Sequence, residues 1–215
     1  MEAQSSSRLA PSLAPEHDWT AARRVIHPAL KPTGTHGSDG HDLRPLTNGS
    51  PGLPLVRQGP AGLPIAYVIP GIGFDVMVGI DHLLSWGVGP DEVHRVAMEN
   101  LAKWSENTAW AEEVDGRRHI IWSDWGQGMD AARILLAEVR ARLSRELGRR
   151  GRILVGMPER DLLIATTLED GDEEFVNMFA DYLTDHSRGS DEPVDHRLFE
   201  LVDEELVPFR VLTPA

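Results

Sequence analysis

Residues 153–167 read Ile-Leu-Val-Gly-Met-Pro-Glu-Arg-Asp-Leu-Leu-Ile-Ala-Thr-Thr. Two short apolar runs, 153–157 and 162–167, lie on either side of four residues that favour a turn. Proline suits the second position of a type I turn, and strands joined by so short a connection must pair antiparallel. This stretch therefore predicts a β-hairpin.

The same kind of pattern recurs on both sides of this hairpin. The pair Asp115 and Gly116 separates two apolar runs, which is a strong hairpin signal. An earlier group of three short runs, broken by Gly and Pro, predicts an antiparallel meander. The strands predicted outside the first hairpin are residues 53–56, 65–69, 74–78, 109–114, 119–122, 198–202 and 206–212.

Three longer segments have apolar residues at helical spacing. They are residues 90–104, 130–147 and 173–183, and a shorter helix is predicted over 81–86. Strands that pair with their sequence neighbours leave the helices to cover the sheet from one side. We therefore expect an α+β fold, with a mostly antiparallel sheet of hairpins and three amphipathic helices on one face.

The first part of the chain differs in composition from the rest. Residues 1–52 are rich in Ser, Pro, Gly and His and predict a flexible tail, in which the partly helical spacing of 19–30 suggests one short helix. His36 and His41 lie in this tail without the fixed surroundings of a designed metal site. Residues 53–215 are predicted to form a single α+β domain.

Composition limits the classes of function. The chain of 215 residues has a net charge of −13 and contains no cysteine, so neither a disulfide nor a thiolate metal site is available. Residues 168–206 hold fourteen acids against two arginines, whereas 133–152 hold seven arginines against two glutamates. Acidic surface repels phosphate backbones, so nucleic acid is not expected as a partner. No apolar run is long enough for a membrane helix, and we expect a cytoplasmic protein.

Three stretches resemble the YtpQ-like family of uncharacterised bacterial proteins. They are residues 65–70 leading into 86–101, residues 130–136, and the strand–turn–strand stretch 155–163, and the resemblance covers about residues 53–212. It implies a small α+β domain, and it implies no catalytic residues because the family has no established activity.

Arg160 and Asp161 form the most suggestive polar motif, at the turn of the first hairpin. A guanidinium can bind a carboxylate or phosphate with two hydrogen bonds, and the carboxylate could orient it. The alternative is that both side chains bond the backbone of their own turn and each other.

Further candidates follow the strand that ends near Trp122. Asp124, Asp130 and Arg133 could share one cleft with the turn at Arg160, although Asp130 also fits the N-cap of the next helix. Trp125 is the candidate for an exposed aromatic contact. No metal-ligand or nucleophile motif is present, so no metal site, cofactor or catalytic residue is assigned.

Two hypotheses about function follow. The first is a non-enzymatic protein-interaction module of the adaptor or acidic-inhibitor type, which holds a protein partner through an exposed sheet face or edge, Trp125 and the acidic last quarter. The second is a small-molecule or anion-binding sensor, or an enzyme, with a cleft lined by the Arg and Asp residues above.

Overall fold

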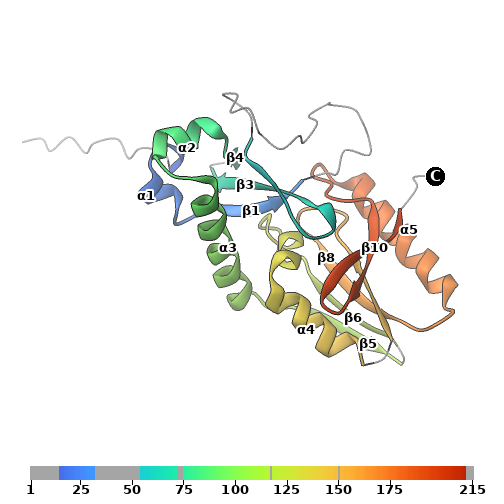
Figure 1. Cartoon of the computed structure of the whole chain (residues 1–215). Helices are drawn as coiled ribbons and strands as arrows, with labels where there is room; N and C mark the ends of the chain where they lie inside the picture. Colours follow the sequence, from blue (N-terminus) through green and yellow to red (C-terminus); the bar gives the residue numbers. More distant parts are fainter. Residues whose placement is uncertain (1–14, 32–53, 72–74, 117, 150, 212–215) are drawn as a thin grey trace, which may run out of the picture.

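The structure is a computed structural model that describes residues 15–31, 54–71, 75–116, 118–149 and 151–211. It confirms the α+β class, with all strands paired antiparallel in two sheets (Figure 1). The predicted tail falls mainly outside these residues, as do His36 and His41.

Ten strands and five α-helices are described, with three short 3-10 helices. In chain order they are η1 (Pro15–His17), α1 (Trp19–Ala22), β1 (His27–Leu30), β2 (Val56–Gln58), η2 (Pro60–Gly62), β3 (Pro64–Pro70), β4 (Asp75–Met77), α2 (Ile80–Trp86), α3 (Pro90–Asn107), β5 (Ala111–Asp115), β6 (Arg118–Ser123), η3 (Ala131–Leu135), α4 (Ala137–Leu147), β7 (Arg152–Gly156), β8 (Leu163–Leu168), α5 (Glu173–Gly189), β9 (Arg197–Val202) and β10 (Glu205–Val211).

The larger sheet contains six strands in the order β10-β9-β7-β8-β6-β5. The hairpins predicted at β5–β6, β7–β8 and β9–β10 are all present. β8 lies between β6 and β7, and β7 lies between β8 and β9. The chain therefore makes two crossovers, from β6 to β7 through α4 and from β8 to β9 through α5.

The helices cover both faces of this sheet, which corrects the prediction of one face. Along β8, Leu163 and Ala165 belong to the apolar cluster that includes α4, whereas Ile164 and Leu168 belong to the cluster under α5. The two crossovers move in the same direction across the sheet but start from strands of opposite direction. Crossovers that share one hand must then place their helices on opposite faces.

The smaller sheet is built around β3. β1 pairs with one edge of β3, and β2 and β4 lie end to end along the other edge. The predicted helix near 19–30 is limited to Trp19–Ala22, because His27–Leu30 is a buried strand in register with residues 65–68. The predicted strand at 53–56 shifts to β2, since Pro54 makes only an isolated bridge to Gly79.

The predicted helix over 130–147 is in fact two helices. Leu136 has an extended backbone, with ψ 125°, and separates η3 from α4. Arg140 donates from Nη1 to the carbonyls of Ile134 and Leu135, both at 3.0 Å, and so satisfies carbonyls that the break frees. The last helix, α5, is longer than predicted and continues to Gly189.

One apolar core joins the two sheets. It contains Ile65 and Tyr67 from β3 together with Val155 from β7 and Phe199 from β9. The second cluster lies on the other face of the large sheet, under α5. The α5 face is therefore the one face of the large sheet that the small sheet does not cover.

Candidate functional site

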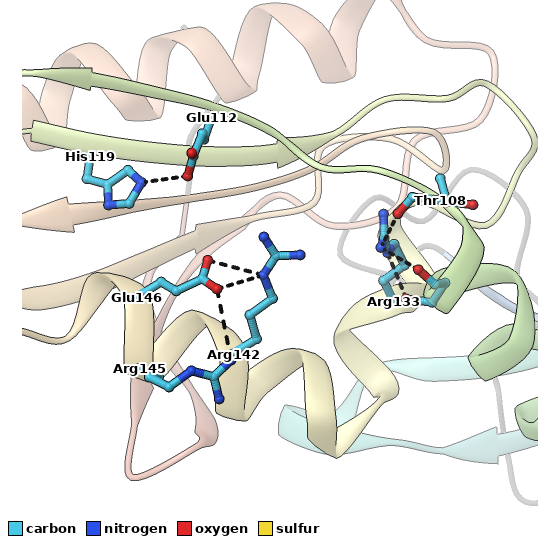
Figure 2. Close-up of polar contacts among 8 residues, drawn as sticks. Thr108, Glu112, His119, Arg133, Arg142, Arg145 and Glu146 are labelled. Atoms are coloured by element: carbon cyan, nitrogen blue, oxygen red, sulfur yellow. Dashed lines mark hydrogen bonds and ion pairs between the residues drawn. The ribbon is translucent and has the colours of Figure 1, made fainter.

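Arg133 is a structural residue rather than a free cation. Its side chain is 0% exposed, and its guanidinium lies 3.8 Å from the centre of the Trp110 ring. It donates to the carbonyls of Ser105 at 3.0 Å and Thr108 at 3.1 Å, which end α3 (Figure 2). Burial lowers the pKa of Arg133 to about 10, so the guanidinium stays charged at neutral pH. The residue caps α3 from the core and presents no donor to a ligand.

Asp130 belongs to the same buried network. It accepts a hydrogen bond from Ser123 Oγ, which in turn accepts one from Arg133 Nη1 at 2.8 Å. Its backbone is helical and its side chain caps no N–H, so the predicted N-cap role is wrong. The carboxylate instead favours the charged form of Arg133 in a buried position.

Arg160 links three segments that are distant in sequence. Its guanidinium pairs with Asp75 in β4, donates to Glu192 after α5 at 2.8 Å, and donates from Nε to the Gly128 carbonyl at 3.2 Å. Asp161 accepts a hydrogen bond from the Gly128 N–H. Arg160 and Asp161 therefore bind Asp75 of the small sheet and two loop residues beside the large sheet, Gly128 and Glu192.

The residues around this clamp line a polar cleft of about 590 Å³. Arg160 and Asp161 lie in it together with Lys31 and Gln127. Burial raises the pKa of Asp161, against the opposing effect of the Gly128 hydrogen bond. The N–H groups of Arg160 already donate to Asp75, Glu192 and Gly128. Lys31 is therefore the main cation that the cleft offers to an anion.

Asp124 and Trp125 lie elsewhere. Asp124 faces the α5 side of the large sheet. Trp125 is 53% exposed, and its indole Nε1 donates to the Ala109 carbonyl at 2.9 Å. The six predicted site residues therefore divide among a buried network, a clamp in a polar cleft, and the region at the end of β6.

A second hollow, lined mainly by apolar side chains, is a groove on the α5 face with a volume of about 470 Å³. We call it the α5 groove. Its floor comes from β6 and β8, one wall comes from α5, and its rim is acidic. Its lining residues are Glu113, Ile120, Trp122, Asp124, Glu159, Leu162, Ile164, Phe175, Met178, Phe179, Tyr182 and His186.

The groove exists because one helix cannot cover the sheet. Six strands at about 4.8 Å spacing span about 24 Å between the outer strands, whereas a helix with its side chains is about 10 Å wide. Ile120 and Trp122 on β6 pack against the edge of the α5 cluster and are only partly buried. Met178 is 53% exposed and Tyr182 is 42% exposed on the wall. These side chains form continuous apolar surface beside the helix.

Three carboxylates are among the lining residues of the groove. At the end near Phe175, Arg118 lies over the aromatic ring at 4.3 Å and is paired with Asp172 at 3.3 Å. Glu113 comes from β5, Asp124 from the end of β6, and Glu159 from the β7–β8 turn. The pKa of Tyr182 is raised by burial and then by the charges of Asp124 and Glu159, which line the same groove. Among the described residues neither Glu113 nor Asp124 has an ion-pair partner.

The arginine-rich residues 133–152 do not neutralise the acidic rim of the groove. Arg152 pairs with Glu200 at 2.5 Å, and Arg140 donates to the Glu204 carbonyl at 2.8 Å, so the two charge tracts do meet in the fold. These contacts involve β9 and the β9–β10 turn, whereas the groove lies toward β5. Arg142 and Arg145 instead share a glutamate on α4 (Figure 2).

Sequence reasoning missed most of the groove. Of the six predicted site residues only Asp124 lines it, and none lies on α5. The available signal was a second stripe on that helix, formed by Met178, Tyr182 and His186 at intervals of four. The floor depends on which strands pair, which the stripe alone does not show.

Comparison with protein families, with curated proteins and with solved structures finds no match to this chain. The resemblance to the YtpQ-like family stays a prediction. Within the described residues, no helix has the length and apolar character needed to cross a membrane.

Proposed function

We propose that this protein is a non-enzymatic interaction module that holds a protein partner in the α5 groove. The observation that carries the proposal is an apolar hollow of about 470 Å³ bounded by Met178, Tyr182 and Trp122. Exposed aromatic and methionine side chains are typical of the central contacts in protein interfaces. The acidic rim and the net charge of −13 favour a partner of opposite charge.

The alternative, an anion-binding sensor or enzyme in the Arg and Asp cleft, receives less support. Arg160 is held by two carboxylates and Arg133 is buried under Trp110. An anion would have to displace Asp75 or Glu192 to reach Arg160. This arrangement favours a clamp between the sheets over a ligand site.

The test is a selection of random peptides displayed on phage against the immobilised protein, followed by binding to two variants. Met178→Glu places a charge on the groove wall, where the side chain is 53% exposed and the fold tolerates it. Leu84→Glu is the matched control, because Leu84 is 73% exposed on α2 and lies outside the groove.

The proposal expects enriched peptides that bind the wild type and Leu84→Glu equally and lose at least about tenfold in affinity for Met178→Glu. Enrichment of no peptide, or of peptides that bind both variants equally well, would count decisively against it.

A further inference from the structure

The shape of the α5 groove restricts the form of what it can hold. Its wall runs along α5 from Phe175 to His186, a distance of about 16 Å at 1.5 Å per residue. From β8 to the edge strand β5 the sheet extends about 10 Å, which is two strand spacings. The strip of sheet beside α5 is therefore about as wide as one helix. The vacant volume thus has the length of about three helical turns and the width of one helix.

The floor offers no backbone hydrogen bonds to a bound chain. One edge of β6 pairs with β5, where Trp122 lies opposite Ala111. The other edge pairs with β8, where Ser123 lies opposite Leu163. A segment lying on this face must therefore satisfy its own N–H and C=O groups. An α-helix does so within the segment, whereas an extended peptide leaves these groups unpaired over an apolar floor.

The rim determines the charge of the occupant. Glu113 lies on β5, Asp124 follows the end of β6, and Glu159 lies in the β7–β8 turn, with 3.8 Å between Glu159 Oε1 and His186 Nδ1. A helix with lysine or arginine on its flanks could place cations against these carboxylates while its apolar stripe faces Trp122.

Resting on the function proposed above, we propose that the partner segment is a basic amphipathic helix of about three turns that lies alongside α5. Its apolar residues enter the groove between Trp122, Met178 and Tyr182, and its basic residues meet Glu113, Asp124 and Glu159. The segment completes the layer of helices on this face of the sheet.

The experiment uses the groove-dependent peptides from the selection. Their sequences are scored for lysine and arginine at the flanks of a helical apolar stripe, and their affinities are measured by fluorescence anisotropy. The protein variants are Glu113→Gln, Asp124→Asn and Glu159→Gln. Glu112→Gln is the matched control, since Glu112 is the neighbour of Glu113 on β5 but faces the opposite side, where it pairs with His119 (Figure 2).

Each rim variant is expected to weaken binding about two- to fivefold, with the loss shrinking at high salt, and Glu112→Gln to leave it unchanged. A proline placed at the centre of the peptide is expected to weaken binding at least about tenfold, because it breaks a helix. Far-UV circular dichroism is expected to show a gain of helix on binding.

The outcomes separate the two proposals. Groove-dependent peptides that are acidic, that tolerate the central proline, or that add as strands to the edge of β5 overturn this inference and leave the proposed function standing. An absence of groove-dependent peptides overturns both.

Discussion

Two polar contact points in the described folded part of the molecule each depend on a single side chain. At the first, Arg133 supplies donors to carbonyls that α3 leaves unpaired at its end. A planar guanidinium carries five N–H donors on three nitrogens, whereas a lysine ammonium carries three on one nitrogen. The side chain that the sequence marks as a ligand contact is therefore a contributor to stability.

Replacing Arg133 with Ala is expected to lower the free energy of unfolding by about 3–5 kcal/mol, because buried carbonyls lose their donors and the buried carboxylate of Asp130 loses the opposite charge nearby. Arg142→Ala is the control, since Arg142 is partly exposed and pairs with Glu146 within α4; it should cost less than about 1 kcal/mol. Urea denaturation followed by tryptophan fluorescence measures both. Equal costs for the two variants would contradict the capping role.

The second point is Gly128, beside Arg160. Its φ of +74° is in the left-handed region, and an added Cβ would lie 1.9 Å from Arg160 Nη2. Gly126 has a similar φ of +69° with nothing within 4 Å.

Gly126→Ala is therefore expected to cost only the backbone strain, about 1 kcal/mol. Gly128→Ala should cost at least about 1 kcal/mol more, because the clamp must move as well. The same denaturation experiment compares the two, and a Gly128→Ala variant as stable as Gly126→Ala would show that the contact with Arg160 is unimportant.

At the scale of elements, a partly buried hydrogen bond joins β3 to α3. Tyr67 Oη lies 2.8 Å from His94 Nδ1, and the tyrosine side chain is buried. Burial raises the pKa of Tyr67 to about 12, partly opposed by Arg57. The folded state thus holds the phenol proton more tightly than the unfolded chain does.

This difference predicts how stability depends on pH. A raised pKa in the folded state contributes stability that is complete below about pH 10, the ordinary value for tyrosine. That contribution is lost as the pH rises toward about 12. Tyr67→Phe should be less stable than the wild type by about 1 kcal/mol at neutral pH, and the gap should close above about pH 10. A gap that stays constant across that range would contradict the pKa shift.

Elements set by local signals were predictable, and elements set by distant partners were not. Asp115-Gly116 and the 158–161 turn each specify a hairpin within a few residues, and both are present. The strand His27–Leu30 depends on β3, which lies more than thirty residues further along the chain. The carbonyls freed by the break at Leu136 are satisfied by Arg140, in the helix that follows the break.

The candidate site shows the same division. The residue types around Arg160 were visible in the sequence, but their partners Asp75 and Glu192 lie far away in the chain. The α5 groove needs a floor from β6 and β8, whose pairing follows from the two crossovers. Local patterns of polarity show neither the partners of Arg160 nor the pairing of β6 with β8.

At the scale of the whole molecule, Arg160 connects the small sheet to the large one. It joins Asp75 in β4 to Glu192 and to the loop at Gly128. The shared apolar core holds the same two sheets, so the clamp adds local order rather than the whole attachment.

Arg160→Ala is therefore expected to speed hydrogen exchange about tenfold or more in β4 and in residues 126–128, with β7 and β8 unchanged. Arg57→Ala is the control, because its pair with Asp91 at 2.9 Å is exposed and should matter little. Exchange that rises equally in every strand would indicate a global loss of stability instead of a lost clamp.

The claim that the α5 groove is the binding surface is tested most directly by NMR. A groove-dependent peptide is titrated into ¹⁵N-labelled protein, and the shifted amides are mapped onto the structure. The account predicts that the largest shifts fall on β6 around Trp122 and on α5 around Met178 and Tyr182, with Asp75 and Gly128 of the polar cleft unaffected. Shifts centred on the polar cleft of Arg160, with α5 silent, would contradict it.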